Sequence, residues 1–218
     1  MQIPISTTPE FDFNGWSQSL IAEFGAHILA AQPEALQLED FLCQVENDLS
    51  RGLSAVDQRR IACGVGCGAC CCVNVAILQP EAHNIAAHLH RTCSVAELNE
   101  LRVRMEQMLV VICGLDDEER IATSQPCVFL DQQGSCSIYP VRPVLCRSIT
   151  STCASACRAA LQYSMFEEPQ PIMMNMFQKK LMETAFTALA RMWQESGGDD
   201  RSQELTAAVF PLLHHLKS

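Results

Sequence analysis

Apolar residues recur at helical intervals along most of the chain, and this pattern predicts a series of amphipathic helices. In the first quarter of the chain the pattern covers residues 16–29 and 36–53, and Pro33 is expected to end the first of these helices. Pro80 opens a third helix over residues 81–91, because proline fits the first turn of a helix. The amino-terminal half is therefore expected to be helical.

Local start and stop signals predict the remaining helices. The segment Ser94-Val-Ala-Glu97 is a capping box, in which serine and glutamate satisfy free backbone N–H groups at a helix start. Residues 174–193 predict a long helix that stops at Gly197. A last helix over residues 205–216 is expected to be interrupted by Pro211, which cannot donate a backbone hydrogen bond.

Strand signals are sparse. Residues 127–130 and 135–139 are rich in strand-forming side chains and are separated by a short loop that ends in Gly134, which is typical of a hairpin. The predicted fold is mainly α, a single helical domain with a small β-hairpin and a cysteine-rich, metal-binding centre. The expected parts are an amino-terminal helical extension (1–60), a cysteine-cluster metal-binding core (61–160) and a carboxy-terminal helical region packing on that core (161–218).

Composition and charge exclude several classes of protein. The 218 residues are 48% hydrophobic, which fits a globular chain, and 15 Lys and Arg against 25 Asp and Glu give a formal charge of -10. Such an acidic chain has no basic surface for nucleic acid. No run approaches the roughly 18 apolar residues of a membrane helix, and residues 1–10 lack a secretory signal. We therefore expect a cytoplasmic protein without nucleic-acid or membrane partners, in which charged residues 116–120 form a solvated turn or helix start.

The chain has 13 cysteines, an odd number that excludes complete internal disulfide pairing. A reducing compartment would also keep most of them as thiols. Three are isolated and are expected in the core: Cys43, Cys93 and Cys113. The other ten fall into two clusters: Cys63, Cys67, Cys70, Cys71 and Cys72, then Cys127, Cys136, Cys146, Cys153 and Cys157.

The first cluster, Cys63-Gly-Val-Gly-Cys67-Gly-Ala-Cys70-Cys71-Cys72, has the spacing of a metal site. Two residues between Cys67 and Cys70 let one tight turn present both thiolates to a metal, and the glycines allow backbone N–H groups to approach the sulfurs. Adjacent cysteines point in different directions, so the last three cannot all converge on one ion. At least one of them is expected to face a second metal, the core or solvent.

The second cluster is expected to supply the remaining ligands. Cys127 and Cys136 lie on the two arms of the predicted hairpin, and Cys146 follows shortly after. A metal shared between clusters so far apart in the sequence would staple distant segments together.

These residues also resemble a known family. The run Cys67-Gly-Ala-Cys70-Cys71, followed by Cys127-Val-Phe-Leu130, Gly134-Ser-Cys136-Ser-Ile-Tyr139, Arg142-Pro143 and Cys146-Arg147, is similar to the CxxCxxCC family of cysteine-cluster proteins, also called the YkgJ family. The resemblance covers residues 63–147 and implies chelation of zinc or iron by cysteines. The chain departs from the family pattern in having three residues between its first two cysteines and Val128 in place of a proline.

The sequence thus predicts a set of metal ligands. They are Cys63, Cys67, Cys70, Cys71, Cys127, Cys136 and Cys146. Small buried or stray thiols explain the three extra cysteines Cys72, Cys153 and Cys157 adequately. Arg142 and Arg147 are expected to offset thiolate charge, with surface salt bridges as the alternative. The histidines are not expected to be ligands, and the methionines near residue 174 are expected to fill the core.

The predicted function is metal binding, with zinc, iron or an iron–sulfur cluster as the cofactor, because thiolates suit all three. Two alternatives stay open. One is a redox or electron-transfer enzyme or accessory that uses the cluster or the vicinal cysteines, and the other is metal storage or buffering, which would need several ions per chain. The chain lacks the common catalytic motifs, so the sequence leaves open whether it is an enzyme and whether it has a protein partner.

Overall fold

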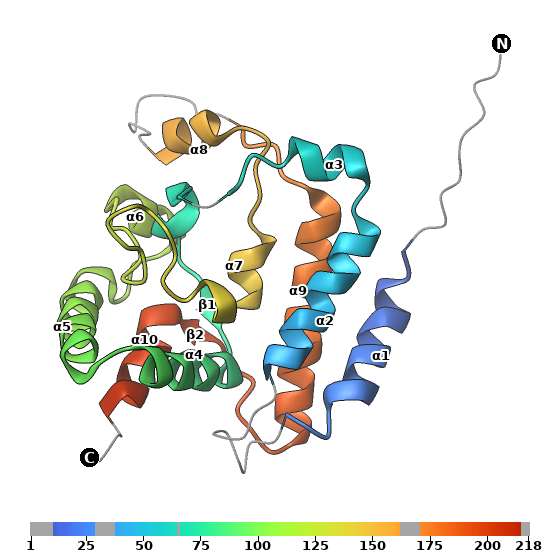
Figure 1. The fold of residues 1–218 in the computed structure, drawn as a ribbon, viewed down its shortest axis with the longest axis horizontal. Coiled ribbons are helices and arrows are strands. Elements are labelled where there is room, and N and C mark those ends of the chain that lie inside the picture. The colour runs from blue at the N-terminus through green and yellow to red at the C-terminus, as the bar shows by residue number, and fades with distance from the viewer. Residues whose placement is uncertain (1–10, 29–37, 65, 162–170, 215–218) are drawn as a thin grey trace.

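The computed structural model describes residues 11–28, 38–64, 66–161 and 171–214, and the chain is mainly α-helical there (Figure 1). The α-helices are α1 (Phe13–Phe24), α2 (Leu38–Gly52), α3 (Ala55–Arg60), α4 (Gln79–Thr92), α5 (Val95–Ile112), α6 (Asp117–Ala122), α7 (Val144–Ser148), α8 (Ala154–Leu161), α9 (Met176–Glu195) and α10 (Leu205–Val209). The 3-10 helices are η2 (Ala69–Cys72), η3 (Tyr139–Val141) and η4 (Phe210–His214). None of the helices within these ranges is long and apolar enough to cross a membrane.

Most of the local start and stop signals are confirmed. At the start of α5, the Ser94 hydroxyl accepts a hydrogen bond from the Glu97 backbone N–H at 3.3 Å, and the Glu97 carboxylate accepts one from the Ser94 N–H at 2.7 Å. Gly197 ends α9 with a φ of +93°, a conformation that favours glycine. Near the carboxyl end, α10 gives way to the 3-10 helix that contains Pro211. The first helix is shorter than predicted: α1 ends at Phe24 and not near residue 29, so Pro33, which lies outside the described residues, does not end it.

The predicted hairpin is a tight turn with almost no ladder. The chain reverses after Leu130, which pairs with Cys136 as an isolated antiparallel bridge. The Asp131 carboxylate accepts hydrogen bonds from the backbone N–H groups of Gln133 and Ser135, each at 2.8 Å, so side-chain bonds hold the turn. The two-stranded sheet instead joins distant segments, because β1 (Ala76–Ile77) pairs antiparallel with β2 (Gln203–Glu204).

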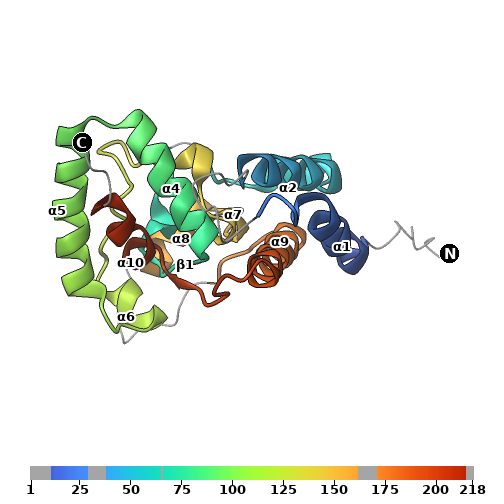
Figure 2. The ribbon, with the colours of Figure 1, turned by 90° about the horizontal axis from the view of Figure 1, so that it is seen from below.

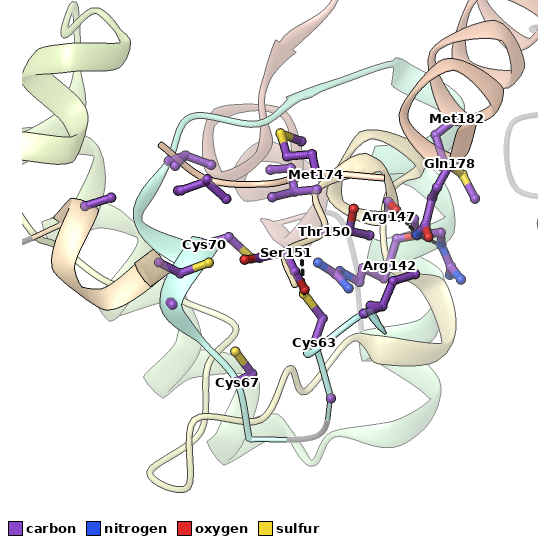
Figure 3. Close-up of a pocket in the computed structure, with 18 of the residues that line it drawn as sticks. Cys63, Cys67, Cys70, Arg142, Arg147, Thr150, Ser151, Met174, Gln178 and Met182 are labelled. Atoms are coloured by element: carbon purple, nitrogen blue, oxygen red, sulfur yellow. Dashed lines mark hydrogen bonds between the residues drawn. The ribbon is translucent and has the colours of Figure 1, made fainter. Parts of the chain in front are cut away.

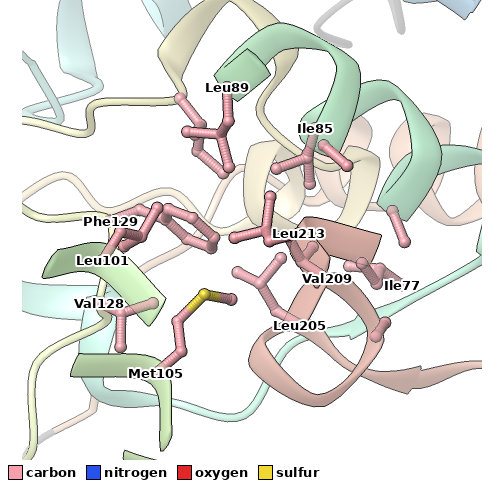
Figure 4. Close-up of a cluster of buried hydrophobic side chains, with 14 of the residues drawn as sticks. Ile77, Ile85, Leu89, Leu101, Met105, Val128, Phe129, Leu205, Val209 and Leu213 are labelled. Atoms are coloured by element: carbon pink, nitrogen blue, oxygen red, sulfur yellow. The ribbon is translucent and has the colours of Figure 1, made fainter. Parts of the chain in front are cut away.

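The helices pack around two clusters of buried apolar side chains. The first core lies among α4, α5, α10 and the segment 127–141, with Phe129 and Met105 at its centre (Figure 4). The second core lies among α1, α2 and α9 and includes Val144 of α7. Figure 2 shows α7 between the two groups of helices. The cysteine segments adjoin this junction.

Glu81 ties α4 to α7. Its carboxylate is 2% exposed and accepts two backbone hydrogen bonds, from the Leu78 N–H at 2.9 Å and from the Val144 N–H at 2.8 Å. This buried bond to the first residue of α7 adds to the packing of α7 against α9 and satisfies a backbone donor that would otherwise be buried without a partner. Because α7 carries Cys146, this buried carboxylate helps to set where that thiol lies.

Two expectations about sulfur-containing side chains are corrected. Cys43 and Cys113 are exposed and do not belong to the core, whereas Cys93 is partly buried against the first core. Cys43 lies on α2 outside the buried face of that helix. Met182 is fully buried, as expected, but Met173 and Met176 are exposed because they lie just before α9 and at its first residue.

Candidate metal centre

The fold brings the two cysteine clusters into direct backbone contact. The N–H of Cys127 donates a hydrogen bond to the carbonyl oxygen of Cys71 at 2.7 Å. Glycines allow the two loops to approach: Gly66 and Gly134 have φ values of +81° and +75°, and a Cβ added to Gly134 would lie 3.1 Å from the Gly66 carbonyl oxygen. Gly66 and Gly68 of the first cluster therefore serve close packing against the loop of Gly134, whereas Gly64 has open space around it.

Five of the predicted ligands line one small cavity of about 40 Å³, which we call the inner cavity. The five thiols come from η2, from the turn after α6 and from α7. They are Cys70, Cys71, Cys127, Cys136 and Cys146. Arg120, Arg142 and Glu204 complete the polar part of its wall.

The other two predicted ligands, Cys63 and Cys67, line a second cavity of about 410 Å³, which we call the outer cavity (Figure 3). Cys157 of α8 also belongs to its wall. The Cys63 sulfur accepts a hydrogen bond from the backbone N–H of Ser151 at 3.3 Å. Cys70 lines both cavities, so the two share a wall.

The predicted ligands line neighbouring cavities, but their sulfurs are not arranged around a common point. Within the part of the chain that the structure describes, no group of three or more His, Cys, Asp or Glu side chains is placed to hold a metal ion. Cys72 is buried and lines neither cavity, and its thiol donates to the Ala69 carbonyl oxygen at 3.2 Å. Cys153 is exposed. The structure thus groups the seven predicted ligands around two adjacent cavities, five and two, with one thiol facing both.

A family model fits this part of the chain. The model "CxxCxxCC: Putative zinc- or iron-chelating domain" matches residues 62–172, which contain all the cysteines of both clusters. The chain belongs to the CxxCxxCC family. No curated protein and no solved structure matches it.

Burial keeps two thiols of this CxxCxxCC domain in their neutral form. Removal from water raises the pKa of the Cys127 thiol to about 11 and that of the Cys146 thiol to about 12. A backbone hydrogen bond from Phe129 and the charge of Arg142 oppose these increases at Cys127 and Cys146 respectively, but burial outweighs both. A positive charge placed among these thiols would favour their thiolate forms.

The adjacent thiols Cys70 and Cys71 differ in their pKa values. A hydrogen bond from the Cys71 thiol, together with nearby Arg142, lowers the pKa of the Cys70 thiol below its ordinary value. The same hydrogen bond and burial raise the pKa of Cys71. The thiol that faces both cavities is therefore the one most readily ionised of the pair.

The two predicted charge-offsetting arginines have different roles. Arg142 lies beside four of the inner thiols, Cys70, Cys71, Cys136 and Cys146, which favour its charged form. Arg147 is buried and its guanidinium is taken up by the Arg142 carbonyl oxygen at 2.7 Å, the Pro140 carbonyl oxygen at 3.4 Å and the Glu46 carboxylate. Arg142 is thus the electrostatic partner of the thiols, and Arg147 mainly fixes the backbone that carries it.

Arg120 is a site residue that the sequence did not reveal. It belongs to the charged stretch expected in solvent, yet it is 3% exposed and lines the inner cavity. Its guanidinium donates to the Gln125 carbonyl oxygen at 2.7 Å and to the Thr123 hydroxyl at 3.3 Å. Only the three-dimensional position of α6 distinguishes it from its exposed neighbours Glu118 and Glu119.

Proposed function

We propose that this CxxCxxCC domain binds one zinc or iron ion in the inner cavity. The observation that carries the proposal is the gathering of five thiols around one cavity of about 40 Å³. These thiols, Cys70, Cys71, Cys127, Cys136 and Cys146, would supply the ligands. Thiolates are preferred ligands of zinc and bind iron as well.

The size of the inner cavity favours a single ion. A water molecule needs about 10–15 Å³ of such space, so 40 Å³ corresponds to about three waters. A cluster of four irons and four sulfides is larger than that and would require the walls to move apart. A single ion needs only rotation of thiols that already line the space.

The charges around the inner cavity also fit a thiolate-bound ion. Four thiolates and one divalent ion carry a net charge of about −2, and the same wall holds the guanidinium groups of Arg120 and Arg142 and the carboxyl group of Glu204, whose pKa is raised by burial. Since burial raises the pKa of Cys127 and Cys146, an ion that binds them must displace their protons, which makes binding weaker at low pH. The bound ion would act as a cross-link among η2, the turn after α6 and α7.

Serine substitutions test the assignment. Cys127→Ser and Cys136→Ser each remove one inner thiol, and we expect metal per chain, measured by mass spectrometry after anaerobic purification, to fall at least about tenfold. The exposed Cys113 provides the matched control, Cys113→Ser, which should keep the wild-type metal content. Circular dichroism of each variant checks that the helices are intact. Wild-type metal content in both inner variants would contradict the proposal.

The outer thiols separate this proposal from a storage function. Storage requires further ions, and Cys63, Cys67 and Cys157 are the thiols available to hold them. Under our proposal, Cys63→Ser and Cys157→Ser retain the wild-type metal content. A stoichiometry above one ion per chain that falls in these variants would instead favour storage. An absorption spectrum of the same sample reports any redox-active iron–sulfur centre.

A further inference from the structure

The outer cavity has the size and lining of a small-molecule site. Its volume of about 410 Å³ lies within the roughly 300–1,000 Å³ of typical ligand pockets and is ten times that of the inner cavity. Most of its wall is apolar, including Ile61, Leu161 and Met174, and a few polar groups converge on it. This combination is typical of a site that binds an organic molecule by its apolar body and orients it by one polar group.

Arg142 is the polar group best placed to receive an anion, although one of its N–H groups already hydrogen-bonds the Cys70 sulfur. A guanidinium has five N–H donors in a planar fork, which suits a carboxylate. Among the residues that the structure describes, no carboxylate forms an ion pair with Arg142. The neighbouring Arg147 differs, because Glu46 and two carbonyl oxygens occupy its guanidinium. Glu46, paired with Arg147, lines the cavity as well, and Figure 3 shows Arg142 and Arg147 in the cavity wall.

We propose that the outer cavity binds a small organic anion, a carboxylate on an apolar chain or ring. The carboxylate would pair with Arg142, and the apolar part would lie against Ile61, Leu161 and Met174. At the 10–15 Å³ of such space that each water needs, the cavity has room for roughly thirty waters, enough for a small organic molecule. This inference goes beyond the metal site and does not depend on which ion occupies it.

The position of the cavity gives the ligand a role at the metal centre. Cys70 and Arg142 line both cavities, so a carboxylate paired with Arg142 lies next to a proposed metal ligand. Such a ligand would share the guanidinium that offsets the thiolate charge. Ligand binding and the electronic state of the metal centre are therefore coupled through one side chain.

Three probes with the same chain and different head groups test the recognition. Hexanoate, 1-hexanol and hexylamine are titrated by calorimetry into the metal-loaded full chain. We expect hexanoate to bind at least about tenfold more tightly than 1-hexanol, because the pairing with Arg142 is charge-assisted. Hexylamine should bind most weakly, although the formal charge of -10 favours cations at long range. In Arg142→Gln the preference for hexanoate over 1-hexanol should disappear.

A matched pair of tryptophan variants locates the site. Met174 lines the outer cavity, whereas the adjacent Met173 is 69% exposed and lines neither cavity. We expect Met174→Trp to abolish hexanoate binding and Met173→Trp to leave it unchanged. Metal content is measured on both variants, so loss of the ligand site is distinguished from loss of the metal. Absence of hexanoate binding by the metal-loaded wild type, or undiminished binding by Met174→Trp, would overturn the proposal.

Discussion

The backbone N–H of Cys127 lies 2.7 Å from the carbonyl oxygen of Cys71, so a main-chain hydrogen bond joins the two cysteine clusters. This bond fixes the position of one cysteine segment against the other without involving a thiol. The side chains of Cys70, Cys71 and Cys127 all line the inner cavity, but they are not placed to hold an ion. The backbone therefore brings these thiols together, and under our proposal a bound ion would draw their sulfurs to one point.

Metal removal should loosen the centre of the protein and spare its helices. None of the buried residues of the second core lines the inner cavity, and those of the first core contribute only Ile138 and Leu205 to its wall, so chelation leaves most of the apolar packing in place. We expect the near-UV circular dichroism to weaken while the far-UV signal changes little. A near-UV spectrum unchanged after complete chelation would contradict the cross-linking role.

Substitution of the two neighbouring arginines should separate charge compensation from architecture. Arg142→Gln removes the cation beside four thiols, and we expect metal affinity to fall about 10–100-fold, as for other groups that support metal ligands. Arg147→Gln breaks bonds to two carbonyl oxygens and Glu46, so it should lower the free energy of unfolding by about 1–3 kcal/mol. Competition with a chelator and urea denaturation measure the two effects. The reverse pattern would refute the division of roles.

Glu81 should make stability depend on pH. Burial raises the pKa of its carboxyl group from 4.5 to about 7 in the folded chain. Between these two values the folded state binds more protons than the unfolded state, so the free energy of unfolding falls as the pH rises from 4.5 to 7. This contribution is complete below pH 4.5 and lost above pH 7. Urea denaturation across that range should show a smaller decline in Glu81→Gln than in the wild type.

The same Glu81→Gln variant tests the link between α4 and α7. Both carboxylate oxygens accept backbone N–H groups, and an amide would place an NH2 group against one of them. We therefore expect a loss of about 1–3 kcal/mol at pH 7.5. The exposed Glu100 on α5 supplies the control, Glu100→Gln, which should behave as the wild type. Equal effects of the two substitutions would argue against the buried link.

Gly134 should be needed for assembly of the cysteine loops. An alanine there meets both a φ of +75° and the Gly66 carbonyl oxygen 3.1 Å from its Cβ. Gly114 has a similar φ of +79° with open space around it, so Gly114→Ala measures the backbone strain alone. Each variant should lose about 1–2 kcal/mol of stability, but only Gly134→Ala should also bind metal more weakly. Unchanged metal affinity in Gly134→Ala would show that the close loop contact is dispensable.

The sequence predicts the features that local chemistry decides. The capping box at Ser94 and the end of α9 at Gly197 each depend on a few adjacent residues, and the structure has both. The cysteine clusters also come together as their spacing suggests. The pairing of β1 with β2 was not predictable, because each strand has two residues and the partners are distant in the chain.

Burial of single polar residues is decided by tertiary packing. Arg120 belongs to a charged stretch whose sequence predicts exposure to solvent. The packing of α6 instead buries Arg120 in the wall of the inner cavity. Cys43 sits within an amphipathic helix and still faces solvent, because a cysteine is small enough for either face. The division of the predicted ligands between two cavities likewise depends on the tight turn of η2, in which Cys70 lines both cavities and Cys71 only the inner one.

The metal content of the anaerobically purified chain, measured with its absorption spectrum, tests the central claim most directly. The account predicts about one zinc or iron ion per chain, with no acid-labile sulfide, and loss of that ion in Cys127→Ser. A chain without metal, or one that carries several irons with sulfide, would contradict a single ion held in the inner cavity.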